Sequence, residues 1–267
     1  MKTAVVFLTT TPKAGTIDFA ALVKEQRNAD VFIMADTDER ILMGHSDVTT
    51  IQIADSECVQ HGYFNSMHLP TTHIKKNPVA FDKFLYYFCK LDKMYDYVWF
   101  FEDDVFIPSV DTLKYLNDKY NSNDLVIANN FCKSDSILDW HWKHIFNKVG
   151  IEPPYYYSMA CAGGLSRKML QTIKQYVDKQ KTLFFLEVML NTIAMKNNLS
   201  ICTPLELKTI VWQGRWDLDE FLLLPNNVFH PKKNIDEHKK YRVEIADAIS
   251  RAHVPEDNLP DFVKKAM

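Results

Sequence analysis

The sequence predicts an α/β fold: a Rossmann-like, mostly parallel sheet with helices on both faces, in a single domain with a C-terminal helical tail. Two observations predict it. The chain has 267 residues, of which 47% are hydrophobic, and this is enough for one large core. In the first half, short apolar runs alternate with stretches of helical spacing, an order typical of parallel sheets with helical crossovers.

Apolar runs rich in β-branched or aromatic residues mark the strands, and polar turn residues end them. The first run stops at Thr9-Thr10-Thr11-Pro12 and the second at Asp36. Helices are indicated where apolar side chains recur on one face. On these signals we expect strands at 4–8, 30–34, 48–53, 99–101 and 125–129, and helices at 18–28, 79–91, 111–120 and 167–179.

Composition excludes several classes of protein. The 31 basic and 34 acidic residues give a net charge of −3, so no overall field favours nucleic acid. No apolar stretch approaches 18 residues and the N-terminal run is too short for a signal peptide, which predicts a cytoplasmic protein without a membrane span. The cysteines are odd in number and form no CxxC pair, so we expect reduced thiols: Cys58, Cys89, Cys132, Cys161 and Cys202.

An acidic triplet ends the fourth expected strand. The aromatic run 97–101 leads directly into Glu102, Asp103 and Asp104, and the chain then turns apolar again. Three adjacent acids repel one another and are costly to desolvate unless a cation neutralises them, and Mg²⁺ or Mn²⁺ suits such oxygen ligands. The alternative is a strand that ends in solvated acids. Parallel strands would bring this triplet to the same edge as Thr9, Thr10 and Asp36, where such sheets bind ligands.

In the second half, two short patterns could face a ligand. Gly163 and Gly164 form the one paired glycine and precede an expected helix, either as a tight turn or as a substrate-facing loop. Residues 130–149 are rich in aromatic rings that could stack on a sugar or base, or pack against the sheet: Trp140, His141, Trp142, His144 and Phe146.

Two further segments carry candidate chemistry. Glu187 is a single acid within an apolar segment, as expected for a general base or an acceptor-binding acid, unless it lies on the wet face of a helix. His230 precedes Lys232 and Lys233 and could be a metal ligand beside a diphosphate clamp, or a structural histidine.

Taken together, these residues resemble the nucleotide-sugar-dependent glycosyltransferases of the GT-A fold. The resemblance rests on the acidic triplet in the place of that group's DxD motif, the small-residue segment 160–164, the acid at Glu187 and the late Phe229-His230-Pro231-Lys232. It covers residues 1 to about 235. It implies a domain at 1–233, with a nucleotide-binding half at 1–128 and an acceptor-binding half at 129–233, before a charged helix and tail at 234–267.

The resemblance also implies the ligands. Asp104, with Asp103 and His230, would hold Mn²⁺ or Mg²⁺, and Glu102 with Asp103 would contact the ribose or the metal. The triplet departs from the family in beginning with Glu102 in place of aspartate. The donor would be a nucleotide sugar such as a UDP- or GDP-sugar, and the acceptor a hydroxyl group of a glycan or another molecule. Glu187 would be the base of an inverting enzyme, or lie beside the anomeric carbon in a retaining one.

Two rival functions remain open. A nucleotidyltransferase acting on a sugar phosphate would use a similar sheet and metal, but it would need a glycine-rich and basic first loop, of which residues 9–15 are a poor version. A catalytically silent glycan-binding protein could keep the aromatic loops. The intact acidic triplet argues against it.

Overall fold

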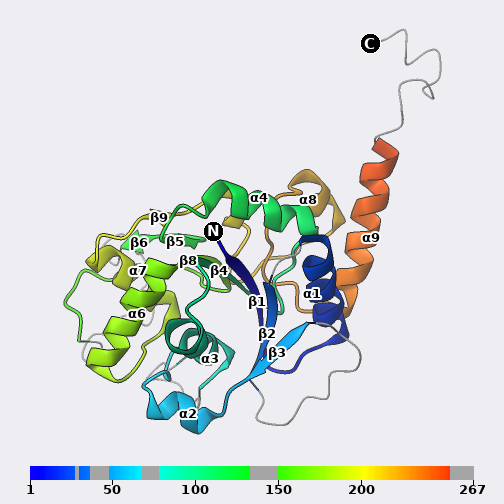
Figure 1. The fold of residues 1–267 in the computed structure, drawn as a ribbon. Helices are drawn as coiled ribbons and strands as arrows, with labels where there is room; N and C mark the ends of the chain where they lie inside the picture. Colours follow the sequence, from blue (N-terminus) through cyan, green and yellow to red (C-terminus); the bar gives the residue numbers. More distant parts are fainter. Residues whose placement is uncertain (28–29, 37–47, 68–77, 133–149, 253–267) are drawn as a thin grey trace, which may run out of the picture.

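A seven-stranded sheet forms the middle layer of the molecule (Figure 1). The computed structural model describes residues 1–27, 30–36, 48–67, 78–132 and 150–252. The strand order is β3-β2-β1-β4-β8-β5-β9. All neighbours are parallel except β8, which runs antiparallel to both β4 and β5. The predicted fold class, a mostly parallel sheet with helices on both faces, is confirmed.

Five of these strands fall within a few residues of the expected positions. The strands of the large sheet are β1 (Thr3–Thr9), β2 (Asp30–Ala35), β3 (Thr49–Gln52), β4 (Tyr97–Glu102), β5 (Leu125–Ile127), β8 (Ala162–Ser166) and β9 (Ile201–Cys202). A separate small sheet pairs β6 (Phe131–Cys132) with β7 (Tyr156–Tyr157).

Helices cover both faces of the sheet (Figure 1). One face carries α1 (Ala14–Arg27) and α4 (Val110–Tyr120), and the other carries α3 (Ala80–Tyr86), its continuation η1 (Tyr87–Leu91), α6 (Arg167–Gln180) and α7 (Leu186–Lys196). The remaining short helices are α2 (Asp55–Gln60), η3 (Leu205–Leu207) and α8 (Leu218–Leu223).

The central strand β4 is hydrophobic up to its last residue, Glu102, because both of its faces are covered. Trp99 lies on the α4 side, where its indole donates a hydrogen bond to the Asn117 side chain at 3.2 Å. Phe100 lies on the other side, with its ring 5.3 Å from that of Phe81 and 5.5 Å from that of Phe84. A buried parallel strand therefore reads as a continuous hydrophobic run, and the acids begin only where β4 leaves the core.

The C-terminal helix α9 (Ile235–Ala252) packs against the body from its first turn to Ile245. The Arg242 guanidinium lies 3.6 Å above the centre of the Phe19 ring in α1. Ile245 belongs to a small core with Phe106, Phe221 and Phe229. Figure 1 shows the last turns of α9 projecting away from the sheet. The expected charged helix at 234–267 is thus described to residue 252, and the remainder lies outside the described residues.

Two further features of the described residues concern the cysteines and the hydrophobicity of the helices. None of the five cysteines, all of them in the described part of the chain, forms a disulfide. Across the described ranges, no helix combines the length and the apolar character that crossing a membrane requires.

Candidate functional site

The acidic triplet lies at the point where the strand order reverses. The chain runs from β1 outward through β2 to β3 and then returns to place β4 on the other side of β1. Ligands of open α/β sheets bind at such a point, outside the carboxyl ends of the strands. Glu102 is the last residue of β4, and Asp103 and Asp104 form the turn that follows it.

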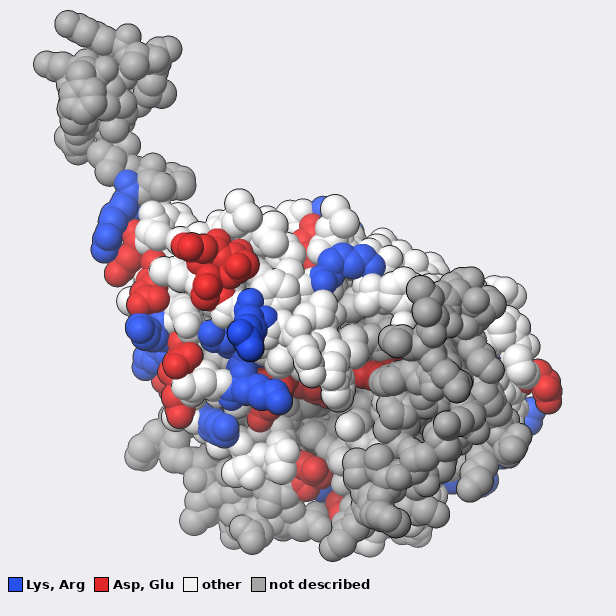
Figure 2. Space-filling model, turned by 180° about the vertical axis from the view of Figure 1, so that it is seen from behind, with Lys and Arg blue, Asp and Glu red and all other residues white. Residues whose placement is uncertain are grey.

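Side chains from three strand ends meet at this edge. The Thr9 hydroxyl donates a hydrogen bond to Asp103 Oδ2 at 2.6 Å, and the Asp36 amide donates to the Thr9 carbonyl at 2.9 Å. A pocket of about 270 Å³ opens here. Figure 2 shows acidic atoms inside a hollow near the middle of one face, with basic side chains gathered to one side of it. The polar residues that line the pocket are Thr9, Thr10, Asp36, Glu102, Asp103 and Asp104.

His230 reaches the same edge from the far end of the chain. Its Nε2 lies 3.5 Å from Asp104 Oδ1, which agrees with the expectation that these residues lie side by side. Its Nδ1 is 2.8 Å from the Val211 carbonyl. A carbonyl can only accept, so Nδ1 carries a proton and Nε2 is the ring nitrogen that faces the acids. This is how histidines that bind metals are usually held.

Main-chain bonds fix this loop against the triplet. Phe229 and Phe106 exchange two backbone hydrogen bonds, of 2.8 and 2.9 Å, and the Lys232 amide donates to the Asp104 carbonyl at 2.8 Å. The triplet and His230 are therefore held together by the fold itself.

Burial and neighbouring charges shift the pKa values of Glu102, Asp103 and His230. Burial, with the nearby Asp104 carboxylate, raises the pKa of Glu102 to about 7. Burial likewise raises the pKa of Asp103, although the Thr9 hydroxyl opposes the shift. Burial lowers the pKa of His230, but the Asp104 carboxylate, the Val211 carbonyl and the Glu102 carboxylate together more than offset this, and the pKa of His230 is raised. Such shifts mark a site that a bound cation would stabilise.

Glu187 lies in the first turn of α7 and is 9% exposed, so it is not on the wet face of a helix. Its Oε2 is buried and has no hydrogen-bond partner in the described structure. Burial raises the pKa of Glu187 to about 8, with a further contribution from the Glu102 carboxylate. Glu187 therefore lies close enough to Glu102 and His230 for their charges to affect its pKa.

The glycine pair is not a ligand-facing loop, which corrects the expectation for Gly163 and Gly164. Both residues are buried in the middle of β8, between β4 and β5. A Cβ on Gly163 would lie 2.7 Å from the Val126 carbonyl, and one on Gly164 would lie 2.5 Å from the Tyr97 hydroxyl. The glycines leave room for neighbouring groups of the sheet.

The ammonium group of Lys232 does not line the acidic pocket, which corrects the expectation that it clamps a diphosphate there. Its Nζ donates to the Trp216 carbonyl at 2.9 Å and to the Tyr241 hydroxyl at 3.1 Å. Lys232 and the exposed Lys233 line a second hollow of about 320 Å³, next to Arg215, and not the acidic pocket. Only the backbone of Lys232 faces the acids.

Two residues that the sequence did not single out contribute to this edge. Lys83 is completely buried in α3, and its Nζ donates to the Asp36 carbonyl at 2.7 Å. The sequence signal that could have identified Lys83 is the presence of charged residues inside an aromatic helix. Cys161 lies beside Glu102, whose amide donates to the Cys161 carbonyl at 2.8 Å, and no local pattern marks it. The aromatic residues Trp140, His141, Trp142, His144 and Phe146 lie outside the described residues.

Comparison with known proteins gives structural similarity only. No family model matches the sequence, and no curated protein matches it. Two solved structures of LgtC, an active-site mutant and a galactosyltransferase complex with donor and acceptor sugar analogs, each share 13% identity over 96% of this chain and 98% of theirs, with a TM-score of 0.47. The apo structure of the bifunctional glycosyltransferase WbbM shares 12% identity over 92% of this chain and 51% of its own, with a TM-score of 0.46. These values say nothing about chemistry, so the functional argument rests on the site.

Proposed function

We propose that this chain is a metal-dependent glycosyltransferase that moves a sugar from a nucleotide-diphosphate sugar to a hydroxyl acceptor, with glycans as the acceptor class. One observation carries the proposal. The Glu102–Asp104 triplet and Thr9 line one pocket at the point where the strand order reverses, and His230 Nε2 lies 3.5 Å from Asp104 Oδ1. That position suits a nucleotide, and the excess of carboxylates suits a divalent cation.

Asp103, Asp104 and His230 would hold the Mn²⁺ or Mg²⁺ ion. The fit is supported by the carboxylate-rich donor set and by Nε2 of His230, which is aligned through the Val211 carbonyl. When bound, the cation would neutralise the charge that develops on the departing diphosphate.

The polar strand ends would bind the rest of the donor. Thr9, Thr10, Asp36 and Glu102 line the pocket. With a pKa of about 7, Glu102 can either donate or accept a hydrogen bond near neutral pH, which suits a ribose hydroxyl. The donor would be a UDP- or GDP-sugar. In this proposal residues 1–128 bind the nucleotide, and residues 129–233 supply His230 and the acceptor side.

Glu187 would serve the acceptor. In an inverting reaction its carboxylate takes the proton of the acceptor hydroxyl while that oxygen bonds to the anomeric carbon and the bond to the diphosphate breaks. Its pKa of about 8 lies close to neutral pH, where a general base is most effective. In a retaining enzyme the same carboxylate would instead act beside the anomeric carbon.

Calorimetry with UDP, GDP and their sugars, with and without Mn²⁺, tests the proposal. Wild type should bind one of them only with the cation. Asp104→Ala should weaken this binding by at least ~10–100-fold, the loss typical of damaged metal sites. Asp118→Ala removes an exposed aspartate of α4 and should bind like wild type. Because removing one of several clustered acids relieves repulsion, Asp104→Ala should unfold no more easily than wild type.

Unchanged nucleotide affinity of Asp104→Ala in saturating Mn²⁺ would refute the metal assignment. Metal-dependent binding of a nucleoside triphosphate together with a sugar phosphate, without binding of nucleotide sugars, would instead indicate a nucleotidyltransferase. Binding of glycans alone would indicate a silent binding protein.

A further inference from the structure

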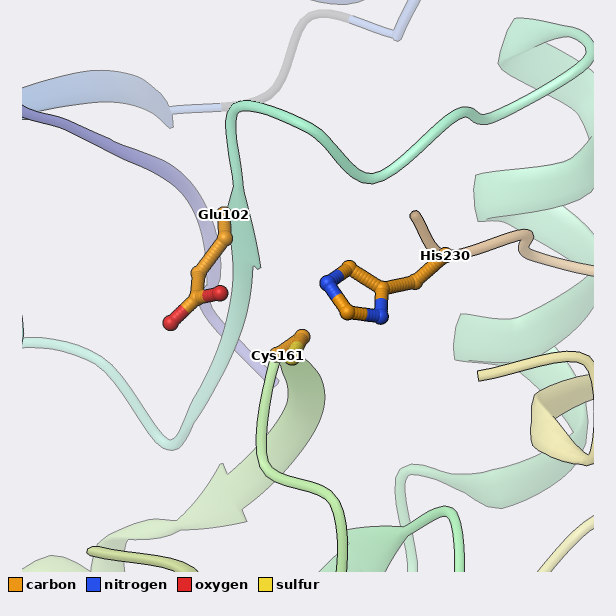
Figure 3. Close-up of side chains that lie close together, drawn as sticks. All are labelled: Glu102, Cys161 and His230. Carbon is orange, nitrogen blue, oxygen red and sulfur yellow. The ribbon is translucent and has the colours of Figure 1, made fainter. Parts of the chain in front are cut away.

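A cysteine thiol lies within the charged site. Cys161 directly precedes β8, and its thiol lies close to the Glu102 carboxylate. Ligand atoms of Glu102, Cys161 and His230 all lie within 4.8 Å of one another. Figure 3 shows that these side chains come from three separate segments of the chain and gather around a common space. A carboxylate, a thiol and an imidazole therefore meet at one point.

The spacing is close to that of a tetrahedral metal site. Zn²⁺ binds sulfur at about 2.3 Å and nitrogen or oxygen at about 2.0–2.2 Å, which places neighbouring ligand atoms roughly 3.5 Å apart. The three atoms would have to approach one another by no more than about 1.3 Å, a movement that side-chain rotation can supply. Nε2 is the nitrogen of His230 that can bind a metal, because Nδ1 is bound to the Val211 carbonyl at 2.8 Å.

A second observation points to a ligand at this place. Glu187 is 9% exposed and has a buried Oε2 that no described group hydrogen-bonds. The same carboxylate interacts electrostatically with Glu102, Cys161 and His230. A buried polar atom without a partner is costly, and a cation beside it would remove that cost.

We propose that Glu102, Cys161 and His230 form a site for borderline-soft divalent cations such as Zn²⁺, in competition with the Mn²⁺ or Mg²⁺ site for the shared His230. Thiolate and imidazole ligands favour zinc, whereas the carboxylates of Asp103 and Asp104 favour magnesium or manganese. Zn²⁺ displaces the thiol proton as it binds, so binding releases protons to the solvent. Zinc in this position takes His230 away from Asp104 and inhibits the enzyme. The binding site stands by itself, and the inhibition rests on the proposed function.

Cobalt provides the decisive probe, because a thiolate ligand to Co²⁺ gives a charge-transfer absorption that oxygen and nitrogen ligands do not. The full chain, stripped of metal with a chelator, should take up one equivalent of Co²⁺ with this absorption, and one equivalent of Zn²⁺ should remove it. Cys161→Ser should lose the absorption and bind Zn²⁺ at least ~10–100-fold more weakly. Cys202→Ser, which removes a thiol from β9, should behave like wild type.

Cys161→Ala, which buries no hydroxyl, provides a second variant should Cys161→Ser fold poorly, and circular dichroism checks both. The proposal is overturned if either folded Cys161 variant keeps the thiolate absorption, or if wild type never shows it. Where a donor and acceptor are known, Zn²⁺ should inhibit wild type and Cys202→Ser but spare the Cys161 variants in saturating Mn²⁺. Equal inhibition of all four proteins would overturn the competition. The cobalt spectra need no substrate, so they separate failure of this site from failure of the proposed function.

Discussion

The acids at the end of β2 share a buried lysine (the balanced cluster), whereas the acids at the end of β4 face an imidazole (the unbalanced cluster), although the two strand ends lie on the same edge of the sheet. Near β2, the fully buried Lys83 ammonium lies 2.9 Å from an Asp55 carboxylate oxygen and 3.7 Å from an Asp36 oxygen. It also donates to the Asp36 carbonyl at 2.7 Å. One cation thus serves two acids within the protein.

Around β4, the carboxyl groups outnumber the positive groups. The triplet from Glu102 to Asp104 and the nearby Glu187 face the imidazole of His230, and Asp103 is also influenced by the exposed Lys13. The difference teaches which acids are structural. Acids that share a buried cation depend less on a ligand for neutralisation, whereas acids without one indicate an external cation.

The largest expected effect tests the unbalanced cluster. Glu187→Gln keeps the shape of the side chain but removes the proton acceptor. Losing a general base typically costs ~10²–10⁴ in rate, so turnover should fall within that range while donor affinity barely changes. Steady-state kinetics with a working donor and acceptor would measure both quantities.

Glu206 offers a matched control for this variant. It is another buried glutamate, but it accepts hydrogen bonds from Lys119 at 3.0 Å and Tyr120 at 2.7 Å. Glu206→Gln should therefore leave turnover close to that of wild type. Near-normal turnover of Glu187→Gln would remove this residue from the mechanism, and a loss confined to donor affinity would move it to the nucleotide side.

The next effect tests the balanced cluster. Lys83→Met keeps the length of the buried side chain and removes its charge, leaving Asp36 and Asp55 without their shared cation. Breaking a buried pair costs ~3–5 kcal/mol. The two carboxylates are about a quarter exposed, so we expect a loss near the lower end, measured as the free energy of unfolding in urea.

Lys114→Met is the comparison for Lys83→Met, because it removes the cation of an exposed helix pair with Asp118. Such pairs contribute about 0–1 kcal/mol. If both variants lose the same small amount of unfolding free energy, Lys83 does not stabilise the folded protein by neutralising Asp36 and Asp55.

Sequence reasoning located the acidic edge because local rules were sufficient there. A buried strand ending in three acids is visible in the residue order, and parallel topology alone brings the ends of β1, β2 and β4 together. The position of His230 next to Asp104 followed from the resemblance to the GT-A-fold glycosyltransferases, since the residues alone left a structural histidine open. The acids are visible as residue types, and the parallel sheet follows from the alternation of strands and helices along the chain.

The failures all involve side-chain direction or contacts across the sheet. Gly163 and Gly164 look like a turn, since glycine carries no side-chain period to reveal β8. Lys232 follows His230 closely, yet its ammonium turns to Trp216. Lys83 and Cys161 acquire their partners only when separate segments meet. Spacing along the chain cannot predict such contacts.

The smallest expected effect is the pH dependence of stability that Glu187 causes in the metal-free protein. Its pKa is about 8 in the folded chain against 4.5 for an ordinary glutamate. A raised pKa means that the folded state favours the protonated acid. This contribution to stability is complete below pH 4.5 and is lost as the pH rises through 8.

Unfolding free energies of wild type and Glu187→Gln, measured from pH 4.5 to 8.5, isolate this term, because the glutamine cannot ionise. Relative to the variant, wild type should lose about 2 kcal/mol over the range, roughly half of what 1.36 kcal/mol per pKa unit allows, because nearby groups relax. Saturating Mn²⁺ should flatten the difference, since a cation near Glu102 and His230 favours the ionised acid. Parallel pH profiles without metal would mean that Glu187 is ionised in the folded protein and that the cluster around β4 is balanced after all.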